Sequence, residues 1–393
     1  MARRKILVVG GGFGGIKSCL LLAKNPNFEV TLITDTLNFR YYPTLFRTAT
    51  GGVDQLSSIP LDKIFSKLPI NIHISSLESV DRSKHLAKTL DRTFSYDILI
   101  LALGVKTNYF NINGLEKYSY GIKTVEDANR LKKHLHNQIA KSLKPDLNYV
   151  VIGGGPTGVE LAAMLPSYVT KILNNHGVDN KDVHVDLIEA TDRILPKSPK
   201  DLSSKVEKHL RKLGINIYTN TVVESETNGR LLANNKPIMS HSVIWTAGVS
   251  NHPFFLNNRF ALSKHGRVVV DKYLQAEPDI YVIGDNADTR FSGLAQTAIY
   301  DAEFISNNLS RLDKGLKPTK YKPKQPIYVF SVGPGWSAVL WGKTKVYGFL
   351  GSWLRHLADI VGYHSFEPWK LALKQAAMEI SSEDDCAICD KKI

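Results

Sequence analysis

The stretch that decides the fold is Ile6-Leu-Val-Val-Gly-Gly-Gly-Phe-Gly-Gly15, near the start of the chain. An apolar run leads directly into a glycine-rich turn, and a second apolar run, Ile16 to Ala23, follows it. This order predicts a buried strand, a tight turn and a helix packed back on the strand. Gly10, Gly12 and Gly15 have the Gly-x-Gly-x-x-Gly spacing of turns that present helix N–H groups to a pyrophosphate. The sequence therefore predicts a dinucleotide site on a parallel α/β sheet.

A carboxylate follows at the place where the ribose of such a nucleotide is bound. The next predicted strand, Val30-Thr-Leu-Ile33, is followed by Asp35. In dinucleotide-binding units an acid about 20 residues beyond the turn accepts hydrogen bonds from the ribose hydroxyls. We therefore expect Asp35 to belong to the same site as the first glycine turn.

The same pattern occurs again in the middle of the chain. Tyr149-Val-Val-Ile-Gly-Gly-Gly-Pro-Thr-Gly158 leads into an apolar run, and Pro156 stands where the first turn of a helix tolerates proline. The following strand, Val183 to Ile188, ends at Glu189. A carboxylate there repels a 2′-phosphate, and no basic residue follows it before Arg193, so NADH is favoured over NADPH. Two complete motifs predict two dinucleotide sites in one chain.

Three further apolar strands end in small residues or in Gly-Asp. They are Tyr96 to Gly104, Ser242 to Gly248 and Asp279 to Asp285. The first two are expected to close one nucleotide domain each and to mark where the chain crosses between domains. Asp285 is expected to bind a flavin ribityl chain, and the alternative for an acid at this place is a helix N-cap.

The composition limits the class of protein. With 393 residues, 43% of them hydrophobic, the chain is long enough for two or three domains. No run approaches the ~18 apolar residues of a membrane-spanning helix, and the basic start Met1 to Lys5 lacks the apolar region of a signal peptide. The three cysteines, Cys19, Cys386 and Cys389, fit a reducing cytoplasm. The formal charge of +13 leaves nucleic acid, an anionic membrane and acidic small molecules as candidate partners.

Together these segments resemble type II NADH:quinone oxidoreductases, single-chain FAD enzymes that bind one membrane face and pump no protons. The resemblance extends from about Lys5 to Asn308 and is looser beyond. Its most diagnostic phrases are Gly155-Pro-Thr-Gly-Val-Glu160 and Ala295-Gln-Thr-Ala298. The other motifs, in order, are Gly10 to Gly15, Pro43 with Ala49-Thr-Gly51, Arg193-Ile-Leu-Pro196, Trp245-Thr-Ala-Gly248 and Ile283-Gly-Asp285. The resemblance implies FAD and NADH as cofactors and a membrane quinone as electron acceptor.

The resemblance also implies which residues form the site. Glu160 would lie near the nicotinamide and flavin rings, to position them or to assist proton movement to the quinone, and Gln296 and Tyr300 would face the quinone. The cofactor-binding residues would be Gly10, Gly12, Phe13, Gly14, Gly15, Asp35, Ala102, Gly104, Gly153, Gly155, Pro156, Thr157, Gly158, Glu189, Gly248, Gly284, Asp285, Ala295 and Gln296. On the residues alone, a polar side chain favoured at a helix N-terminus also explains Glu160 and Gln296. Hydride transfer is the chemistry of the cofactors, so no nucleophile or metal is expected.

Three positions depart from the family pattern. The ribose acid of the family directly follows its strand, whereas here Thr34 comes before Asp35. The family's Ala-Thr-Gly reads Ala102-Leu-Gly104. The family's Ala-Gln-x-Ala-x-Gln ends in Tyr300 instead of the second glutamine; a phenol still donates a hydrogen bond to a quinone carbonyl, but it is bulkier.

Thiol redox catalysis is not expected. Related disulfide reductases need a Cys-x4-Cys pair after the first glycine helix, and the corresponding stretch Phe39 to Phe46 contains no cysteine. Cys19 is expected to be a small core residue. Cys386 and Cys389 have the spacing of a metal or redox pair, but a zinc site needs about four ligands and no second pair exists. Residues 381–393 are therefore predicted to be a flexible tail.

The positive charge gathers toward the C-terminus. Between Lys314 and Lys374 there are ten Lys and Arg residues and only two acids. Apolar residues recur there at helical spacing, while Arg355, His356 and Asp359 fall on other faces. The first apolar set is Leu350, Trp353, Leu354, Leu357, Ile360 and Val361, and the second is Phe366, Trp369, Leu373 and Ala377. Two basic amphipathic segments predict a helix pair lying in a membrane interface, and the alternative is core helices packed on the flavin domain. Nucleic acid is not expected, because no recognition motif is present.

The predicted fold class is α/β, with two Rossmann-like dinucleotide-binding domains, one inserted in the other, and a C-terminal amphipathic membrane-docking segment. We expect an FAD domain at 1–114 and 248–312, an NADH domain at 115–247, and a membrane-docking and quinone-site segment at 313–380. The expected place is the cytoplasmic side of the cell membrane, as a peripheral protein. The alternatives are a soluble NADH-dependent flavoprotein reductase with a protein or other small-molecule acceptor, and a flavoprotein that binds NADH without useful turnover. Which quinone is used and whether the chain forms a homodimer stay open.

Overall fold

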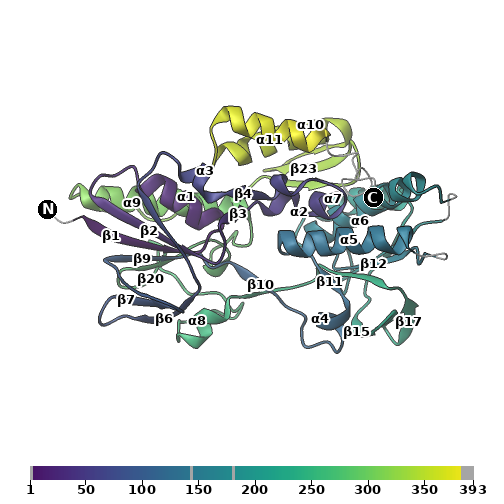
Figure 1. Cartoon of the computed structure of the whole chain (residues 1–393), viewed down its shortest axis with the longest axis horizontal. Helices are drawn as coiled ribbons and strands as arrows, with labels where there is room; N and C mark the ends of the chain where they lie inside the picture. Colours follow the sequence, from purple (N-terminus) through teal and green to yellow (C-terminus); the bar gives the residue numbers. More distant parts are fainter. Residues whose placement is uncertain (1–2, 142–144, 179–181, 382–393) are drawn as a thin grey trace.

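The chain forms two α/β lobes side by side, with a pair of helices lying across both (Figure 1). The computed structural model describes residues 3–141, 145–178 and 182–381. The predicted tail, with Cys386 and Cys389, lies outside these residues except for Ser381.

The first lobe is built on a six-stranded sheet in the order β20-β21-β9-β1-β2-β5. Its strands are β1 (Arg4–Val9), β2 (Phe28–Thr34), β5 (Ile70–Ile74), β9 (Ile98–Leu101), β20 (Gln275–Glu277) and β21 (Ile280–Val282). Neighbouring strands are parallel except β20 and β21. Successive residues of a strand point to opposite faces, so Ile6 and Val8 enter one core and Leu7 and Val9 enter another. Burial on both faces explains why these strands are continuous apolar runs in the sequence.

Different layers cover the two faces of this sheet. Helices α1 (Phe13–Leu22) and α9 (Ala295–Asp313) pack together on one face, where Cys19 is fully buried as predicted. The opposite core also includes residues of a small antiparallel sheet, β6 (Leu77–Asp81), β7 (Leu86–Thr89) and β8 (Thr93–Ser95), and of α8 (Pro253–Asn257). The connecting segments contain β3 (Asn38–Arg40), β4 (Ser58–Pro60), α2 (Leu45–Ala49), α3 (Leu61–Phe65) and the 3₁₀ turns η1 (Tyr42–Thr44), η2 (Asp54–Leu56) and η3 (Gly284–Asn286).

The second lobe repeats the parallel-sheet plan. Its five parallel strands are β11 (Tyr120–Gly121), β18 (Ser242–Trp245), β12 (Asn148–Ile152), β13 (His184–Ile188) and β14 (Ile215–Tyr218), in that order across the sheet. Its helices are α4 (Leu115–Tyr118), α5 (Val125–Ala140), α6 (Pro156–Asn175) and α7 (Lys200–Lys212), and a small sheet adds β15 (Val223–Thr227), β16 (Arg230–Ala233) and β17 (Lys236–Met239). Because all five strands lie between β9 and β20 in the sequence, this lobe is inserted in the first. The predicted α/β class with two Rossmann-like sheets is confirmed.

The chain crosses between the lobes in a two-stranded antiparallel ribbon. It consists of β10 (Val105–Thr107) and β19 (Val249–Asn251), which begin next to the predicted crossing glycines Gly104 and Gly248. The buried side chain of Asn286 ties the two crossings together. Its Oδ1 accepts the N–H of Gly104 at 2.8 Å, and its Nδ2 donates to the side-chain oxygen of Asn251 at 2.7 Å. The two crossings are therefore held in register at one end of the ribbon.

The C-terminal part spans the two lobes. It contains the small sheet β22 (Tyr328–Ser331), β23 (Ser337–Trp341) and β24 (Thr344–Tyr347), followed by α10 (Gly348–His364) and α11 (Trp369–Ser381). Phe330 and Leu340 belong to the core of the second lobe, while Tyr363 and Phe366 belong to the core of the first. Within the described ranges, no helix is long and apolar enough to cross a membrane.

Helix α10 turns its apolar stripe outward. Trp353 and Val361 are 56% and 57% exposed, whereas Arg355 and Asp359 are buried. The sequence pattern thus separates the two faces of the helix correctly, but it is the charged face that packs on the protein. The predicted packing alternative therefore holds only for one side of α10, because Tyr363 enters the core of the first lobe while Trp353 and Val361 stay outside any core.

The inward charges form a buried cluster, which we name the ion cluster: Arg47 of α2, Arg355 and Asp359 of α10, and Glu379 of α11. Oε1 of Glu379 lies 2.8 Å from Nη2 of Arg355 and 2.9 Å from Nε of Arg47. Arg355 also lies 3.2 Å from Asp359. Two buried guanidinium groups and two buried carboxylates thus face one another, and Glu379 joins the C-terminal helix to α2, whose Leu45 and Phe46 lie in the core of the second lobe.

We predict that Glu379→Gln strongly destabilises the protein. Removing one partner of a buried ion pair leaves charge uncompensated and costs about 3–5 kcal/mol. Chemical denaturation of the full chain measures the loss. Glu303→Gln is the matched control, because Glu303 is 3.8 Å from Lys17 on a partly exposed surface and should lose at most ~1 kcal/mol. Equal losses in the two variants would show that the ion cluster does not hold the C-terminal helices.

Candidate functional site

The two glycine turns have the same geometry. Gly10 and Gly153 have φ values of +114° and +108°, a region in which other residues are strained. A Cβ on Gly15 would lie 1.9 Å from the carbonyl oxygen of Gly10, and one on Gly158 would lie 1.9 Å from that of Gly153. The first and third glycines of each motif are therefore required by the protein's own packing.

The middle glycines serve a different purpose. A Cβ on Gly12 or on Gly155 would meet no atom within 4 Å. Both residues are the N-caps of their helices, α1 and α6, and neither cap is closed by a side chain. Each turn therefore leaves open space against free helix N–H groups, which is what a nucleotide pyrophosphate needs. The residues present fit two dinucleotides.

The acids beyond the two turns lie differently. Thr34, not Asp35, is the counterpart of Glu189: each directly follows the strand residue, Ile33 or Ile188, whose carbonyl accepts the N–H of the first glycine. The Thr34 hydroxyl packs on Gly11, whereas the Glu189 carboxylate accepts the N–H of Gly154 at 2.7 Å. Asp35 is one residue farther out, with its side chain 48% exposed and 3.5 Å from Arg40. Its carboxylate is accessible beside the first turn.

The surroundings of Glu189 favour NADH over NADPH. Glu189 is buried against the second turn and also accepts the N–H and hydroxyl of Thr191 at 2.8 Å each. Arg193 is the first basic residue beyond it, and its guanidinium donates to the carbonyls of Pro196 and Ser198 at 2.5 and 2.9 Å. With Arg193 engaged in this way, a 2′-phosphate would meet the carboxylate of Glu189 without help from the first basic residue beyond it.

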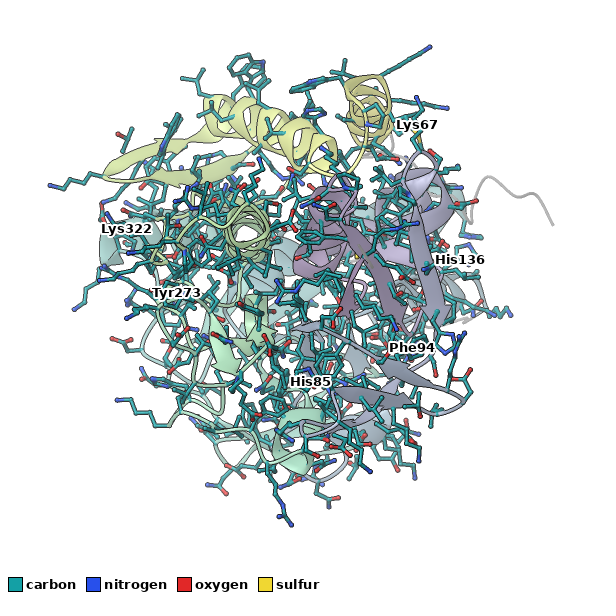
Figure 2. The ribbon with its side chains drawn as sticks, turned by 90° about the vertical axis from the view of Figure 1, so that its left-hand side faces the viewer. Lys67, His85, Phe94, His136, Tyr273 and Lys322 are labelled. Carbon is teal, nitrogen blue, oxygen red and sulfur yellow. The ribbon has the colours of Figure 1, made fainter. Side chains whose placement is uncertain are left out.

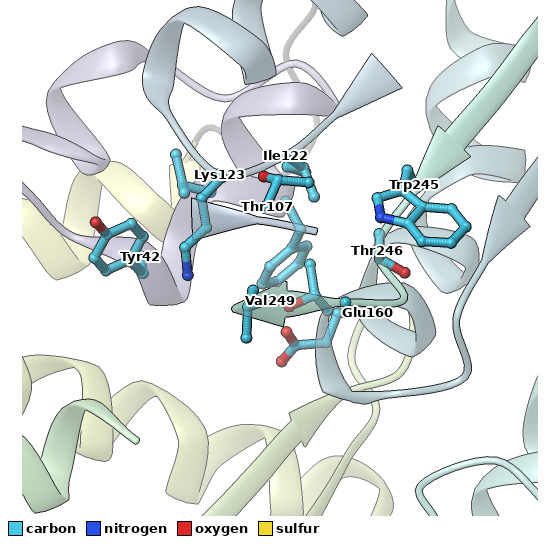
Figure 3. Close-up of a pocket in the computed structure, with 12 residues that line it drawn as sticks. Tyr42, Thr107, Ile122, Lys123, Glu160, Trp245, Thr246 and Val249 are labelled. Atoms are coloured by element: carbon cyan, nitrogen blue, oxygen red, sulfur yellow. The ribbon is translucent and has the colours of Figure 1, made fainter. Parts of the chain in front are cut away.

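A cavity lies where the two lobes meet, and polar side chains from both lobes point into it (Figure 3). The carboxyl of Glu160 enters from α6, and the ammonium of Lys123 enters from the segment before α5. Its lining residues are Tyr42, Leu45, Phe46, Thr107, Ile122, Lys123, Thr157, Glu160, Trp245, Thr246, Gly248 and Val249. Predicted residues Thr157, Glu160 and Gly248 thus line the same cavity.

Glu160 is placed as an acid that holds a proton near neutral pH. Burial raises its pKa to about 7, against the opposing charges of Arg355 and Arg47 and the N–H of Ser331, which donates to Oε1 at 3.2 Å. Because α6 begins at Pro156, Glu160 stands in the second turn and faces the cavity instead of capping the helix. Sequence reasoning missed Tyr42, Phe46 and Lys123 in this cavity. Their available signals were the motif around Pro43 and the Thr-x-x-Asp capping box that follows Lys123.

The predicted quinone-site residues lie on one helix. Gln296 and Tyr300 stand one turn apart on α9, which starts at Ala295, so Gln296 is inside the helix instead of ahead of it. Oε1 of Gln296 accepts the N–H of Ile327 at 2.8 Å. The ammonium of Lys324 lies 4.8 Å from the centre of the Tyr300 ring. Both residues therefore contact the segment that leads from α9 into β22.

Some of the remaining predicted residues are buried in the protein core, and others are accessible to a ligand. Phe13 is buried among the rings of Phe39, Tyr41 and Phe366, so its side chain belongs to the core. Asp285 is partly exposed inside the turn η3, whose N-cap is Ile283, so the helix-cap alternative is wrong. The other positions pack tightly or leave the backbone accessible: the carbonyl of Ala102 contacts Gly10, Gly14 packs on Ile283, and Gly104 and Gly284 have positive φ.

The comparisons with known proteins agree with this geometry. Residues 4–302 match the model of the pyridine nucleotide-disulphide oxidoreductase family. The chain belongs to this family, and membership implies binding of a flavin and a nicotinamide nucleotide.

Within the family, the chain is similar to type II NADH:quinone oxidoreductases. It is 26% identical to the enzyme of Staphylococcus epidermidis over 337 residues, covering 80% of this chain and 83% of the relative. It is 26% identical to Ndh of Mycobacterium tuberculosis, covering 92% of this chain and 85% of the relative. Its fold is that of NDH2 from Plasmodium falciparum, solved in complex with NADH, with a TM-score of 0.87, 20% identity and coverage of 97% and 98%.

We predict that two alanine substitutions in the second turn fail in different ways. Gly155→Ala puts its Cβ into open space, so stability should change by less than ~0.5 kcal/mol while the KM for NADH rises at least about tenfold. Gly158→Ala puts its Cβ against Gly153 and Thr246 and should cost about 1–3 kcal/mol of stability. Thermal unfolding and NADH-dependent flavin reduction separate the two effects.

Gly12→Ala is the matched control for specificity, because it makes the same change in the first turn. It should lower FAD content and leave the second turn intact. An unchanged KM for NADH in Gly155→Ala would mean that the second turn does not hold NADH.

Proposed function

We propose that this chain oxidises NADH with a bound FAD and passes two electrons to a membrane quinone without pumping protons. The observation that carries the proposal is that each sheet has one open glycine turn and that a cavity with side chains of both lobes lies between the lobes. Thr157 of the second turn lines this cavity, as does Tyr42, which stacks on Phe13 of the first turn. Two dinucleotides bound at these turns would extend their rings toward each other. The type II NADH:quinone oxidoreductases that resemble this chain over most of its length support the same acceptor.

The residues divide between the two nucleotides. The first turn (Gly10 to Gly15), Asp35, Ala102, Gly104, Gly284 and Asp285 would hold FAD, with Ala295 and Gln296 near its ring; the second turn (Gly153 to Gly158), Glu189 and Gly248 would hold NADH. When bound, FAD would accept a hydride from NADH and pass two electrons on to the quinone. The protein's part is to stack the two rings at reacting distance and to keep water out. The domain limits 1–114 with 248–312, and 115–247, belong to this proposal.

Glu160 and α9 would serve the quinone. Reduction of a quinone to a quinol takes up two protons, and Glu160 holds one up to pH about 7. Gln296 keeps its NH₂ group as a donor while its oxygen is engaged by Ile327. Tyr300 would offer a phenolic O–H in place of the family's second glutamine.

The outward apolar face of the C-terminal helices would lie in the membrane surface. We name this the docking face: Trp341, Phe349, Leu350, Trp353, Leu357, Val361, Trp369, Leu371 and Leu373, all exposed. Side chains of the two helices project away from the body of the protein, and the exposed Lys67 lies near them (Figure 2). Exposed large apolar side chains in this number, on two successive helices and at the end of β23, are unusual on a soluble surface. The proposal places the protein peripherally on the cytoplasmic side of the cell membrane, with residues 313–380 docking it.

Turnover with quinone tests the proposal. Detergent-purified, FAD-loaded protein should oxidise NADH rapidly only when a short-chain quinone is added. Stopped-flow absorbance of the flavin separates its reduction from its reoxidation. Flavin that NADH reduces but quinone does not reoxidise would favour a protein acceptor or a non-turnover role. A purified chain that retains no FAD would overturn the proposal.

We also predict that detergent, and not salt, releases the protein from membranes. Half a dozen large apolar side chains at ~1.5–3 kcal/mol each could contribute about 10 kcal/mol, whereas each Lys or Arg adds ~1 kcal/mol at an anionic surface. In 1 M salt, screening acts over ~3 Å and removes the second contribution only. Sedimentation of washed membranes followed by immunoblotting measures the partition.

A charge on the docking face should weaken this binding, because one apolar contribution of ~1.5–3 kcal/mol is lost and a carboxylate must leave water. Leu357→Glu is the test variant, and Leu256→Glu is its matched control, because Leu256 is an exposed leucine on α8, at the opposite side of the molecule (Figure 1). Clean release of the unmodified protein in 1 M salt, or equal release of the two variants, would count against membrane insertion.

A further inference from the structure

An ammonium group enters the cavity without an ion-pair partner among the described residues. Lys123 is half-buried at the cavity wall, and its Nζ points into the open space in Figure 3. Burial lowers its pKa, and the one acid whose charge acts against this is Asp285. A partly desolvated cation of this kind gains most when an anionic group is bound beside it.

The backbone at Lys123 is fixed. It directly precedes the capping box of α5, in which Thr124 Oγ1 accepts the N–H of Asp127 at 3.0 Å. The Asp127 carboxylate in turn accepts the N–H groups of Thr124 and Lys123 at 3.1 and 3.3 Å. The side chain therefore leaves from a rigid helix start, which aims it at one place in the cavity.

Lys123 comes from the second lobe but reaches the side of the cavity that belongs to the first. Its Nζ lies 4.8 Å from the centre of the Tyr42 ring. Tyr42 stacks on Phe13 of the first glycine turn, with ring centres 6.3 Å apart. Asp285, which acts electrostatically on both Lys123 and Tyr42, is also a residue of the first lobe. The nucleotide bound at the first turn is thus the one whose ring, extended into the cavity, would lie beside this cation.

We propose that Lys123 stabilises the negative charge that the flavin ring acquires when it is reduced. The inference rests on the proposed function, because it requires FAD at the first turn. Hydride transfer moves two electrons and one proton from NADH to a neutral ring, so NAD⁺ leaves and the ring keeps one negative charge. When the two electrons pass to the quinone, the quinol takes the ring's proton and one from the protein or solvent, and the charge disappears.

A fixed cation suits this cycle. The cation interacts strongly with the negatively charged reduced ring and only weakly with the neutral oxidised ring. It therefore stabilises bound reduced FAD more than bound oxidised FAD, which favours reduction. Aromatic and aliphatic walls around it, including Tyr42, Leu45 and Phe46, keep the local dielectric low and the interaction strong. Lys123 is therefore a residue that sets the reduction potential of the bound flavin.

The test is the reduction potential of FAD in Lys123→Met, measured anaerobically in the holoprotein against a reference dye. The equilibrium constant for flavin reduction should fall at least about tenfold, which is ~30 mV for a two-electron couple. Lys123→Arg keeps the charge and should restore most of the potential. Lys106→Met is the matched control, because Lys106 is exposed on β10 in the same interlobe ribbon and should leave the potential unchanged.

The outcomes distinguish this inference from the function on which it rests. A potential in Lys123→Met equal to that of the unmodified protein, with full FAD content, overturns the role of Lys123 and leaves the proposed function standing. An unmodified protein that holds no FAD overturns both. A variant that loses FAD is replaced by Lys123→Gln, and an unchanged potential there overturns the inference in the same way.

Discussion

The pairing of Glu379 with Arg47 and Arg355 is the constraint on which the C-terminal architecture depends. Burying two guanidinium groups and two carboxylates is costly, and their attraction offsets this cost only when the geometry is good. Arg355 and Asp359 stand one turn apart on α10 and pair with each other, and the pairing of Arg355 with Glu379 fixes which side of α10 faces the lobes. The opposite side of the helix, with Trp353, is then turned outward. An apolar core could hold α10 as firmly, but it would bury the stripe that the proposed membrane contact needs.

The ion cluster also affects the pKa of Glu160 in the cavity. Arg355 and Arg47 lower the pKa of Glu160, Glu379 raises it, and burial outweighs them all to leave it near 7. The residues that attach the docking helices therefore act electrostatically on the acid in the cavity. Any shift of α10 or α11 relative to α2 would change the balance of these charges around Glu160. The attachment of the C-terminal helices and the proton affinity of Glu160 therefore depend in part on the same residues.

The sequence could predict the parts of the fold and site that depend on local geometry. The glycine turns follow from steric requirements within ten residues, so Gly10, Gly15, Gly153 and Gly158 could be assigned from their spacing alone. The amphipathic period of α10 was also visible, but a helical period separates two faces without saying which one is buried. That choice depends on Arg47 and Glu379, which are more than 300 residues apart in the chain. Lys123 could not be predicted either, because the cavity that its ammonium enters forms only where the two lobes meet.

The cavity contains a basic and an acidic side chain that do not pair with each other. The ammonium of Lys123 and the carboxyl of Glu160 both point into the space between the lobes, and the described residues form no ion pair between them. In an empty cavity such groups would gain by pairing, unless the backbone holds them at a distance. The capping box before α5 and the Pro156 start of α6 do hold them, one on each side. A cation on one side of the gap suits a ring that becomes anionic when it is reduced. A protonated acid on the other side suits an acceptor that takes up a proton. The separation of the two side chains is then the feature by which the protein suits rings that lie between them.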